Sequence, residues 1–437
     1  MSDTAVLDAS AAPHPRISSR QVAAAVAGNA LEFYDFTTYA YFAVQIGHVF
    51  FPGRTAFLSL MLSLGTFGAG FILRPIGSLV IGRFADKVGR RPAMLFSFTL
   101  MGLAILGLAL TPSFASIGVL APVLVVVWRL TQGFALGGEV GPTTAFLVEA
   151  APPEQRGFYG AWQSAGQNLA QIAGGLVGVT LAVSTGPAAL EHWGWRVAFL
   201  LGAATLPFGL ILRRHLPETL HRVEPAHHAR PDRPTLAAHW RIIALGLALI
   251  AGATVSTYAF NFMTTFAMAH LHMAAGVSLG ATLANGAFGL VGSLAGGALS
   301  DRFGRRAMMI WPRIAFLIVT WPAYWLIVRN HDATTLLGAT ALLALLSNLS
   351  VASVIVAITE SLHKDIRGAA MGVIYATAVA LVGGTTQLAI EALIHWTGDR
   401  LAPAWYVMGF TTIALIASLM MRESAVGLPP VVGTLGD

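Results

Sequence analysis

A few ionisable side chains interrupt the long apolar stretches of this chain. Asp35 lies about 22 Å along the stretch 21–47, and Arg129 lies about 18 Å along the stretch 117–146, at 1.5 Å per helical residue. Burial favours the neutral form of a carboxyl group, and a nearby cation favours its charged form. Asp35 could bind and release a proton beside Arg129, directly or with an anion between them, or the two could form a permanent salt bridge. Tyr39 follows Asp35 by four residues and is expected on the same helix face.

A second group of ionisable residues, Glu32, Arg74 and Glu139, lies nearer one end of such stretches. A guanidinium holds a carboxylate in a two-pronged geometry, so Arg74 is a candidate ligand for an anionic substrate. The residue 215 positions further on is Gly289, so this arginine is not repeated later in the chain. Glu32 and Glu139 are candidates for proton binding. The alternative is that all three form a buried charge network that holds one end of the molecule shut.

A polar stripe marks the stretch 157–184. Gln163, Gln167 and Gln171 are spaced by four residues, with Ser164 and Asn168 beside them, so a helix places them on one face. Amides can bond both carboxylates and hydroxyls, and they are unfavourable against lipid. The stripe is therefore expected to face a central cavity and bind substrate, with hydrogen bonding between helices as the alternative.

The second half of the chain carries fewer charges within its apolar stretches. Arg313 lies close to the end of its stretch and is expected to reach the membrane interface. The histidines near stretch ends are expected at the surface, and their spacing predicts no metal site. Candidate cavity contacts are Asn261 and Tyr375, with Tyr258, Asn285, Asn348 and Gln387 as further polar residues.

These residues require membrane-spanning elements to position them. Hydrophobic residues make up 56% and charged residues 11% of the sequence, where a soluble domain has about 25% charged residues. Twelve apolar stretches are each roughly long enough to cross a bilayer, which predicts an all-α integral membrane protein. The expected units are a tail 1–20, a six-helix bundle 21–212, a linker 213–240, a second six-helix bundle 241–421 and a tail 422–437. The stretches are 21–47, 57–82, 93–111, 117–146, 157–184, 195–212, 241–269, 276–299, 307–328, 335–359, 368–394 and 403–421.

The distribution of basic residues predicts the orientation. Of the 26 Lys and Arg residues, 19 fall in the tails and in alternate connections on one side, and four fall on the other side. Basic residues mark the cytoplasmic side, so both termini are expected there. Because the positive charges occupy several separate loops, a nucleic-acid partner is not expected. The absence of cysteine excludes disulfides and thiolate metal sites.

Two short patterns occur twice. GRFADKVGRR at 82–91 is answered by GALSDRFGRR at 297–306, 215 residues later. Glu149 stands seven residues before an Arg-Gly pair, and Glu360 does the same 211 residues further on. Such repeats predict two fused copies of one ancestral unit. In a membrane protein, parallel halves of this size are typical of a transporter with its site between them.

The chain resembles the major facilitator superfamily over nearly its whole length. The motifs that carry the resemblance are the two loops, RLTQG at 129–133 and PET at 217–219. Within that superfamily it is similar to the metabolite:proton symporters, through GNALEFYDF at 28–36, RPIG at 74–77 and QGFALGGE at 132–139. Two further stretches, AWQSAGQN at 161–168 and TGDRLAPAW at 397–405, are similar to citrate and tricarballylate importers.

The resemblance implies a transporter that is not an enzyme and that imports an organic acid, such as citrate or a related tricarboxylate, by alternating access. Proton influx would drive it through Asp35, Glu32 or Glu139, with no cofactor and no metal. The chain would act as a monomer in a bacterial-type inner membrane. Alternatives are symport of a dicarboxylate such as 2-oxoglutarate, symport of a zwitterion such as proline or betaine, an efflux antiporter and a membrane sensor.

The repeated loops are expected to act as a conformational latch. Their acidic residues, Asp86 and Asp301, can pair with a neighbouring helix when one side of the carrier closes and separate when it opens. Their glycines permit tight turns and close helix approach. The alternative is that the loops only fix orientation through positive charge. The predicted latch residues are Gly82, Asp86, Arg90, Asp301 and Arg305.

Overall fold

The computed structural model describes residues 19–88, 90–137, 147–148, 151–204, 207, 239–362 and 367–424. Within these ranges the regular structure is helical throughout, and strands are absent. In the first half the helices are α1 (Ser19–Tyr41), α2 (Ala43–Phe50), α3 (Ala56–Ile72), α4 (Arg74–Val88), α5 (Arg90–Leu110), α6 (Phe114–Ile117), α7 (Leu120–Leu136), the 3₁₀ turn η1 (Pro153–Gln155), α9 (Arg156–Ala189), the π-helical η2 (Leu190–Gly194) and α10 (Trp195–Ala204).

The second half follows the same plan with longer unbroken helices. Its eleventh apolar stretch is divided into three parts, because a π-helical turn, η4, separates α16 from α17. The elements are α12 (Trp240–Ala269), α13 (Ala275–Phe303), α14 (Arg305–Asn330), α15 (Ala333–Ser361), α16 (Arg367–Ala378), η4 (Val379–Gly383), α17 (Gly384–Thr397) and α18 (Ala402–Met420).

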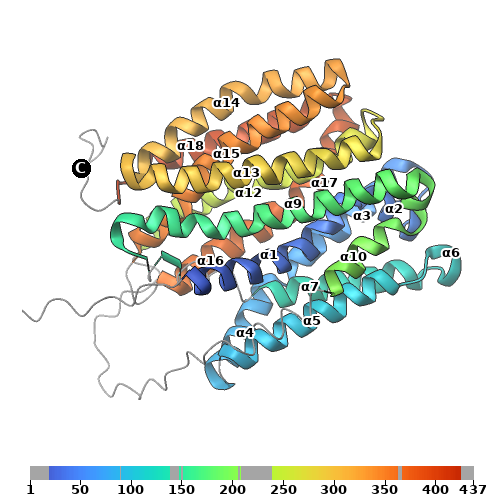
Figure 1. Cartoon of the computed structure of the whole chain (residues 1–437), viewed down its shortest axis with the longest axis horizontal. Helices are drawn as coiled ribbons and strands as arrows, with labels where there is room; N and C mark the ends of the chain where they lie inside the picture. The colour runs from blue at the N-terminus through green and yellow to red at the C-terminus, as the bar shows by residue number, and fades with distance from the viewer. Residues whose placement is uncertain are drawn as a thin grey trace, which may run out of the picture.

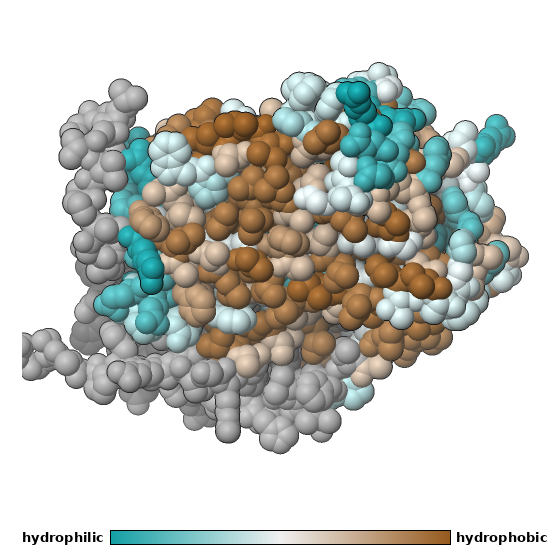
Figure 2. All heavy atoms as spheres, turned by 45° about the horizontal axis from the view of Figure 1, so that its top comes forward, coloured by the Kyte–Doolittle hydropathy of each residue, from teal (hydrophilic) through white to brown (hydrophobic). Residues whose placement is uncertain are grey.

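Each of the twelve predicted stretches contains a helix in the described ranges. By length and composition, eight helical segments there can cross a membrane, and one of them, Pro153–Ala204, covers two predicted stretches. On the face drawn in Figure 2, apolar side chains cover the middle of the molecule and polar ones gather towards both ends. This is the surface that a bilayer requires, since its core solvates no polar backbone or charge.

The helices run roughly along one direction, and the molecule therefore has two ends (Figure 1). We call the end with the repeated loops 82–91 and 297–306 the basic end and the other end the opposite end. α9 of the first half lies along α13 of the second, and small residues permit that approach. A Cβ atom on Gly286 would lie 2.7 Å from the backbone nitrogen of Ile172. Larger side chains at this contact would force the halves apart.

A second contact between the halves joins α3 to α17. A Cβ atom on Gly68 would lie 2.5 Å from the carbonyl oxygen of Gly384, so the two backbones touch. Towards the opposite end, the Phe57 and His395 rings stack with centroids 3.6 Å apart. The halves are thus in contact along two helix pairs, and the opposite end is closed between α3 and α17.

Candidate functional site

Two buried arginines of the first half lie in one cluster of aromatic rings, which we call the chamber. Arg74 is 4% exposed and Arg129 is fully buried. The Phe36 ring of α1 contacts both, with its centroid 4.4 Å from Cζ of Arg74 and 4.5 Å from Cζ of Arg129. Aromatic faces attract a guanidinium, and the attraction strengthens where water is excluded. The chamber therefore holds two positive charges close together at the level of α1.

Arg129 is anchored within the first half. Its Nη1 donates to Oε1 of Gln132 at 2.6 Å, and its Nη2 donates to the Phe67 carbonyl at 3.4 Å. The Tyr39 ring lies 4.5 Å from its Cζ. Among the described residues Nε of Arg129 has no hydrogen-bond partner. The predicted proximity of Arg129 to the Asp35–Tyr39 face of α1 is observed at Tyr39, while the structure does not describe the Asp35 side chain.

Arg74 opens α4, directly after the break at Leu73 that ends α3. Its Cζ lies 4.3 Å from the Phe71 centroid, and its Nε and Nη2 are buried without a hydrogen-bond partner in the described part of the chain. Burial of an unpaired N–H group costs about 1–3 kcal/mol. These donors are therefore available to an acceptor that enters the chamber.

The second half closes the chamber with an aromatic side chain. The Tyr258 ring of α12 packs edge-on against Phe71 at 5.3 Å and against Phe67 at 5.9 Å. Separation of the halves would remove this cover, so access to the arginines depends on the relative position of the two bundles.

The polar stripe of α9 faces other helices and joins the two halves. Asn168 donates to Ser293 Oγ at 3.0 Å and to Asn348 Oδ1 at 3.2 Å, and both partners belong to the second half. Asn285 Nδ2 donates to Gln171 Oε1. Within the first half, the Asn29 side chain donates to the Gln163 carbonyl at 2.9 Å. In this closed arrangement these amides therefore form hydrogen bonds between helices, which was the alternative to substrate binding.

The stripe also borders a small polar cavity of about 30 Å³ between the halves. A space of this size holds about one water molecule. An organic acid would need the halves to separate at this level first. The lining residues are Ser164, Gln167, Asn168, Gln171, Thr257, Phe260, Asn285, Asn348 and Val351.

The remaining predicted site residues are placed as follows. Glu32 is buried in α1. Asn261 is 1% exposed in α12, and neither polar atom of its side chain has a hydrogen-bond partner in the described ranges. Tyr375 of α16 is within hydrogen-bonding reach of Gln167, so these two predicted contacts meet across the halves. Glu139 lies outside the described residues.

At the basic end, Asp301 joins the two halves. Its Oδ1 accepts from the backbone nitrogen of Gly157 at 2.8 Å, and its Oδ2 accepts from that of Phe158 at 2.9 Å. These N–H groups belong to the first turn of α9, where the helix lacks internal acceptors and its dipole favours negative charge. Asp301 lies in the last turn of α13, and it caps a helix of the other half.

Arg305 holds this capping carboxylate in place. It is 1% exposed and contacts Asp301 at 2.6 Å and Glu360 at 3.3 Å. The repeated Glu360 is thus part of the same cluster. In the first repeat, Gly82 and Asp86 lie in α4 and Arg90 begins α5, and the structure describes only the backbone there.

Two side chains lie where the sequence reasoning did not expect them. Arg313 was expected to reach the membrane interface, but it is 4% exposed and its Nη1 donates to the Met309 carbonyl at 3.0 Å and to Ser418 Oγ. His270 was expected at the surface, but its Nε2 lies 2.7 Å from Oε2 of Glu391. The sequence reasoning missed Glu391, although an ionisable residue within an apolar stretch was the signal that could have found it.

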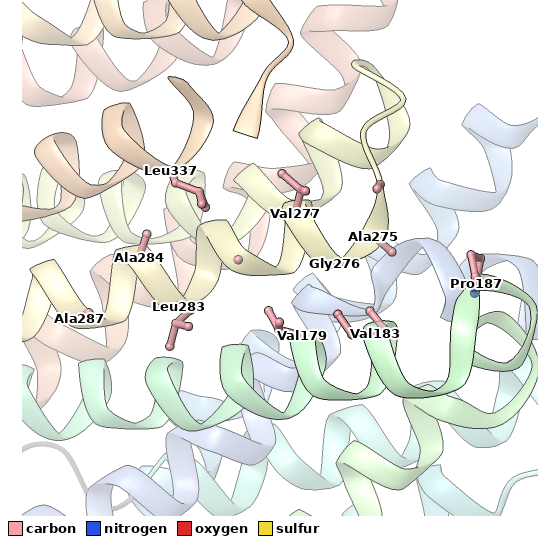
Figure 3. Close-up of a pocket in the computed structure, with 13 residues that line it drawn as sticks. Val179, Val183, Pro187, Ala275, Gly276, Val277, Leu283, Ala284, Ala287 and Leu337 are labelled. Carbon is pink, nitrogen blue, oxygen red and sulfur yellow. The ribbon is translucent and has the colours of Figure 1, made fainter. Parts of the chain in front are cut away.

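A second hollow lies apart from these polar residues. It is an apolar groove of about 710 Å³ between α9 and α13 near the opposite end (Figure 3). Val179 and Val183 line one wall, and Val277 and Leu283 line the other. The groove offers no charged group to an anion. In the described ranges no three His, Asp or Glu side chains are placed to hold a metal ion.

Two bundles of membrane-crossing helices, with buried cations and amides at the surface between them, define a secondary carrier. The chain belongs to the Major Facilitator Superfamily, whose sequence pattern matches residues 26–386. This confirms the predicted fold class of twelve transmembrane helices in two six-helix halves. A crystal structure of a D-xylose-proton symporter superposes with a TM-score of 0.70 at 18% identity, over 92% of this chain and 96% of that one.

Relatives with similar sequences are named as symporters, transporters and permeases. A citrate-proton symporter of Klebsiella pneumoniae is 36% identical over 92% of this chain and 91% of its own. A proline/betaine transporter of Salmonella typhimurium is 30% identical, covering 93% and 84% of the two chains. An alpha-ketoglutarate permease of Escherichia coli K12 is 32% identical, covering 93% and 94%.

Proposed function

We propose that this chain imports an organic acid together with protons, and that citrate or a related tricarboxylate is the substrate. The observation that carries the proposal is the pair of buried arginines in one chamber, with unpartnered N–H groups on Arg74 and Arg129 among the described residues. Two neighbouring cations suit an anion with several carboxylates, because each guanidinium can hold one carboxylate. The names of the citrate-proton symporter relatives support this choice.

The proposed cycle uses the contacts between the halves. Substrate would enter between α3 and α17, and its carboxylates would meet Arg74 and Arg129. Tyr39, Gln163, Gln167, Asn168, Asn261 and Tyr375 would complete the site as the halves close. Asp35, with Glu32 and Glu139 as further candidates, would bind the coupled proton. The protein would act as a monomer, without a cofactor and without enzymatic activity.

The proposed orientation follows the basic residues. The basic end and both termini would lie in the cytoplasm of a bacterial-type cell, because Lys and Arg gather there. The domain limits proposed from the sequence, with a linker at 213–240 between bundles 21–212 and 241–421, accompany this orientation. Closure at the basic end would then depend on Asp301 and Arg305, and on Asp86 and Arg90 of the first repeat.

A dicarboxylate is the second candidate substrate, supported by the name of the alpha-ketoglutarate permease relative, and a zwitterion is the third. The buried arginines favour an anion over a zwitterion, whose cationic group they would repel.

Uptake of labelled citrate into proteoliposomes, with and without an imposed inward proton gradient, tests the proposal. Accumulation only under the gradient supports it, and competition by unlabelled 2-oxoglutarate, proline or betaine ranks the alternatives. Uptake of proline or betaine without competition by carboxylates would refute the anion assignment.

A further inference from the structure

The pair formed by His270 and Glu391 is not part of the chamber. His270 follows the end of α12, and Glu391 lies in α17 at the opposite end. Nε2 and Oε2 are 2.7 Å apart, and the side chains are 18% and 3% exposed. At this separation the two side chains form a hydrogen bond, which needs one proton between Nε2 and Oε2. A buried pair that holds one proton has no net charge, whereas the pair without it is a buried anion, which is costly.

Glu391 lies on the face of α17 that meets the first half. Gly384 touches Gly68 of α3. Cδ1 of Leu388 lies 3.9 Å from the position of a Cβ atom on Gly65. His395, one turn beyond Glu391, stacks on Phe57. The spacing of 384, 388, 391 and 395 is that of one helix face. Separation of α3 from α17 at this end would therefore bring water to Glu391.

The first half contains a similar pair that differs in exposure. His48 of α2 and Glu191 of η2 are 2.8 Å apart, but their side chains are 45% and 51% exposed. The two pairs occupy matching places in the two halves. Each pair joins the end of the first span of its own half to the region of the fifth span of that half. This pair is already about half exposed in the closed arrangement, so closure does not bury it.

We propose that His270 and Glu391 form an outer proton site, which binds one proton from the external solution as α3 and α17 close. This rests on the proposed function for its orientation and for the role of the proton gradient. Closure buries the pair, and burial disfavours its anionic state relative to its uncharged state with one proton. By linkage, a state that binds more protons is favoured as the pH falls. External acid thus favours closure of the outer side.

Other titratable groups near the pair do not replace it. α3 carries none between Ala56 and Ile72, and the nearby phenols stay neutral between about pH 5 and pH 8, because an ordinary phenol has a pKa of about 10. His395 is exposed at the rim. Among the described residues, the surrounding helices carry the phenols Tyr39, Tyr41, Tyr258, Tyr324 and Tyr406. The helix ends and connections at this end carry the charged or basic residues His48, Arg54, Glu191, His192, Arg196, His272, Arg329, His331, Asp332, Asp399 and Arg400.

The π-helical turn η4 offers a place for α17 to move. It lies between α16 and α17, just before the Gly68–Gly384 contact. Such turns weaken the regular hydrogen bonding of a helix and often lie at functional sites. The segment from Gly384 to Thr397 can therefore open while α16 stays packed on α12.

A distance measurement in the full-length carrier tests the proposal without substrate. The chain has no cysteine, so Leu58→Cys with Trp396→Cys, both exposed, gives a single pair of spin-label sites on α3 and α17. In liposomes, the short-distance population is expected to grow as the pH falls from about 8 to about 5, the range in which histidine changes charge. Glu391→Gln is expected to lose this response, and His270→Gln to lose it as well.

Glu191→Gln and His48→Gln are the matched controls, and they are expected to retain the response. The proposal is overturned if the parent pair shows no pH response, if Glu391→Gln and His270→Gln keep it, or if Glu191→Gln loses it equally. Should Glu391→Gln not fold, His270→Gln decides the question, because His270 lies after the helix end. A carrier that closes with acid but does not accumulate citrate would refute the proposed function and leave the proton site standing.

Discussion

The two halves of the molecule differ in where they hold charge. In the first half, Arg74 and Arg129 lie deep among aromatic rings. The second half has Gly289 in place of Arg74, and its described ion pairs lie at the two ends, around Asp301 and at Glu391. Both halves keep the loop pattern, but only the first half places two guanidinium groups against the same aromatic ring. The repeat thus preserves the loops of the proposed latch, while the arginines of the proposed substrate site belong to the first half alone.

Asp35→Asn tests whether the coupled proton, like the two chamber arginines, belongs to the first half. Asparagine retains the size and hydrogen-bonding capacity of the carboxyl but cannot release a proton. We expect accumulation of citrate driven by a pH gradient to be abolished, while exchange of labelled for unlabelled citrate survives. Both are measured in proteoliposomes. If the variant still concentrates citrate, the coupling carboxyl is elsewhere, and Glu32 and Glu139 are tested next.

Arg129→Lys addresses the buried cations directly. Lysine keeps the charge but loses the two-pronged grip, and a hydrogen bond to a charged group contributes about 1.5–3 kcal/mol. We expect citrate affinity to fall about ten-fold or more, measured by equilibrium binding. The control is Arg313→Lys in the second half, which removes another buried guanidinium outside the chamber. Equal losses in both variants would contradict a special role of the first half.

Asp301→Asn tests the repeated loop, which both halves contain. A helix cap contributes about 0.5–2 kcal/mol, so the equilibrium of closure at the basic end should shift about 2- to 30-fold. Transport is expected to slow while citrate binding is largely retained. Asp332→Asn, at the exposed cap of α15, is the control and should change neither. Asp86→Asn should behave like Asp301→Asn, and a parallel loss of binding would argue against a latch.

The smallest expected effect concerns the amides between the halves. Asn168→Ala removes the hydrogen bonds to Ser293 and Asn348, each worth about 1 kcal/mol. We expect a lower thermal unfolding midpoint and a less stable closed state. Asn330→Ala, which loses only an exposed hydrogen bond to Thr335, is the control. An unchanged midpoint in Asn168→Ala would show that these amides do not hold the halves together.

Much of this arrangement could be predicted from the sequence. Hydropathy located the helices, and the repeated loops indicated two halves, because both signals depend on residues close in the chain. The deep arginines were found because a charge in an apolar stretch is costly. Partners are harder to predict. Helical periodicity predicts that Gln163 and Asn168 share a face. It does not predict that Asn348 and Ser293 of the second half lie against Asn168.

The unpredicted pairs have the same cause. His270 and Glu391 are 121 positions apart, and Arg313 and Ser418 are 105 apart. Neither periodicity nor propensity couples residues at such separations. Only the packing of α12 on α17 and of α14 on α18 brings them together.

The π-helical turn in the eleventh span has a consequence for ancestry. One extra residue in a helix rotates every later side chain by about 100° about the helix axis. The two ancestral copies therefore stop matching face for face beyond Val379, even where their lengths agree. A single insertion at η4 therefore sets which face α17 turns towards α3, and with it the position of Glu391.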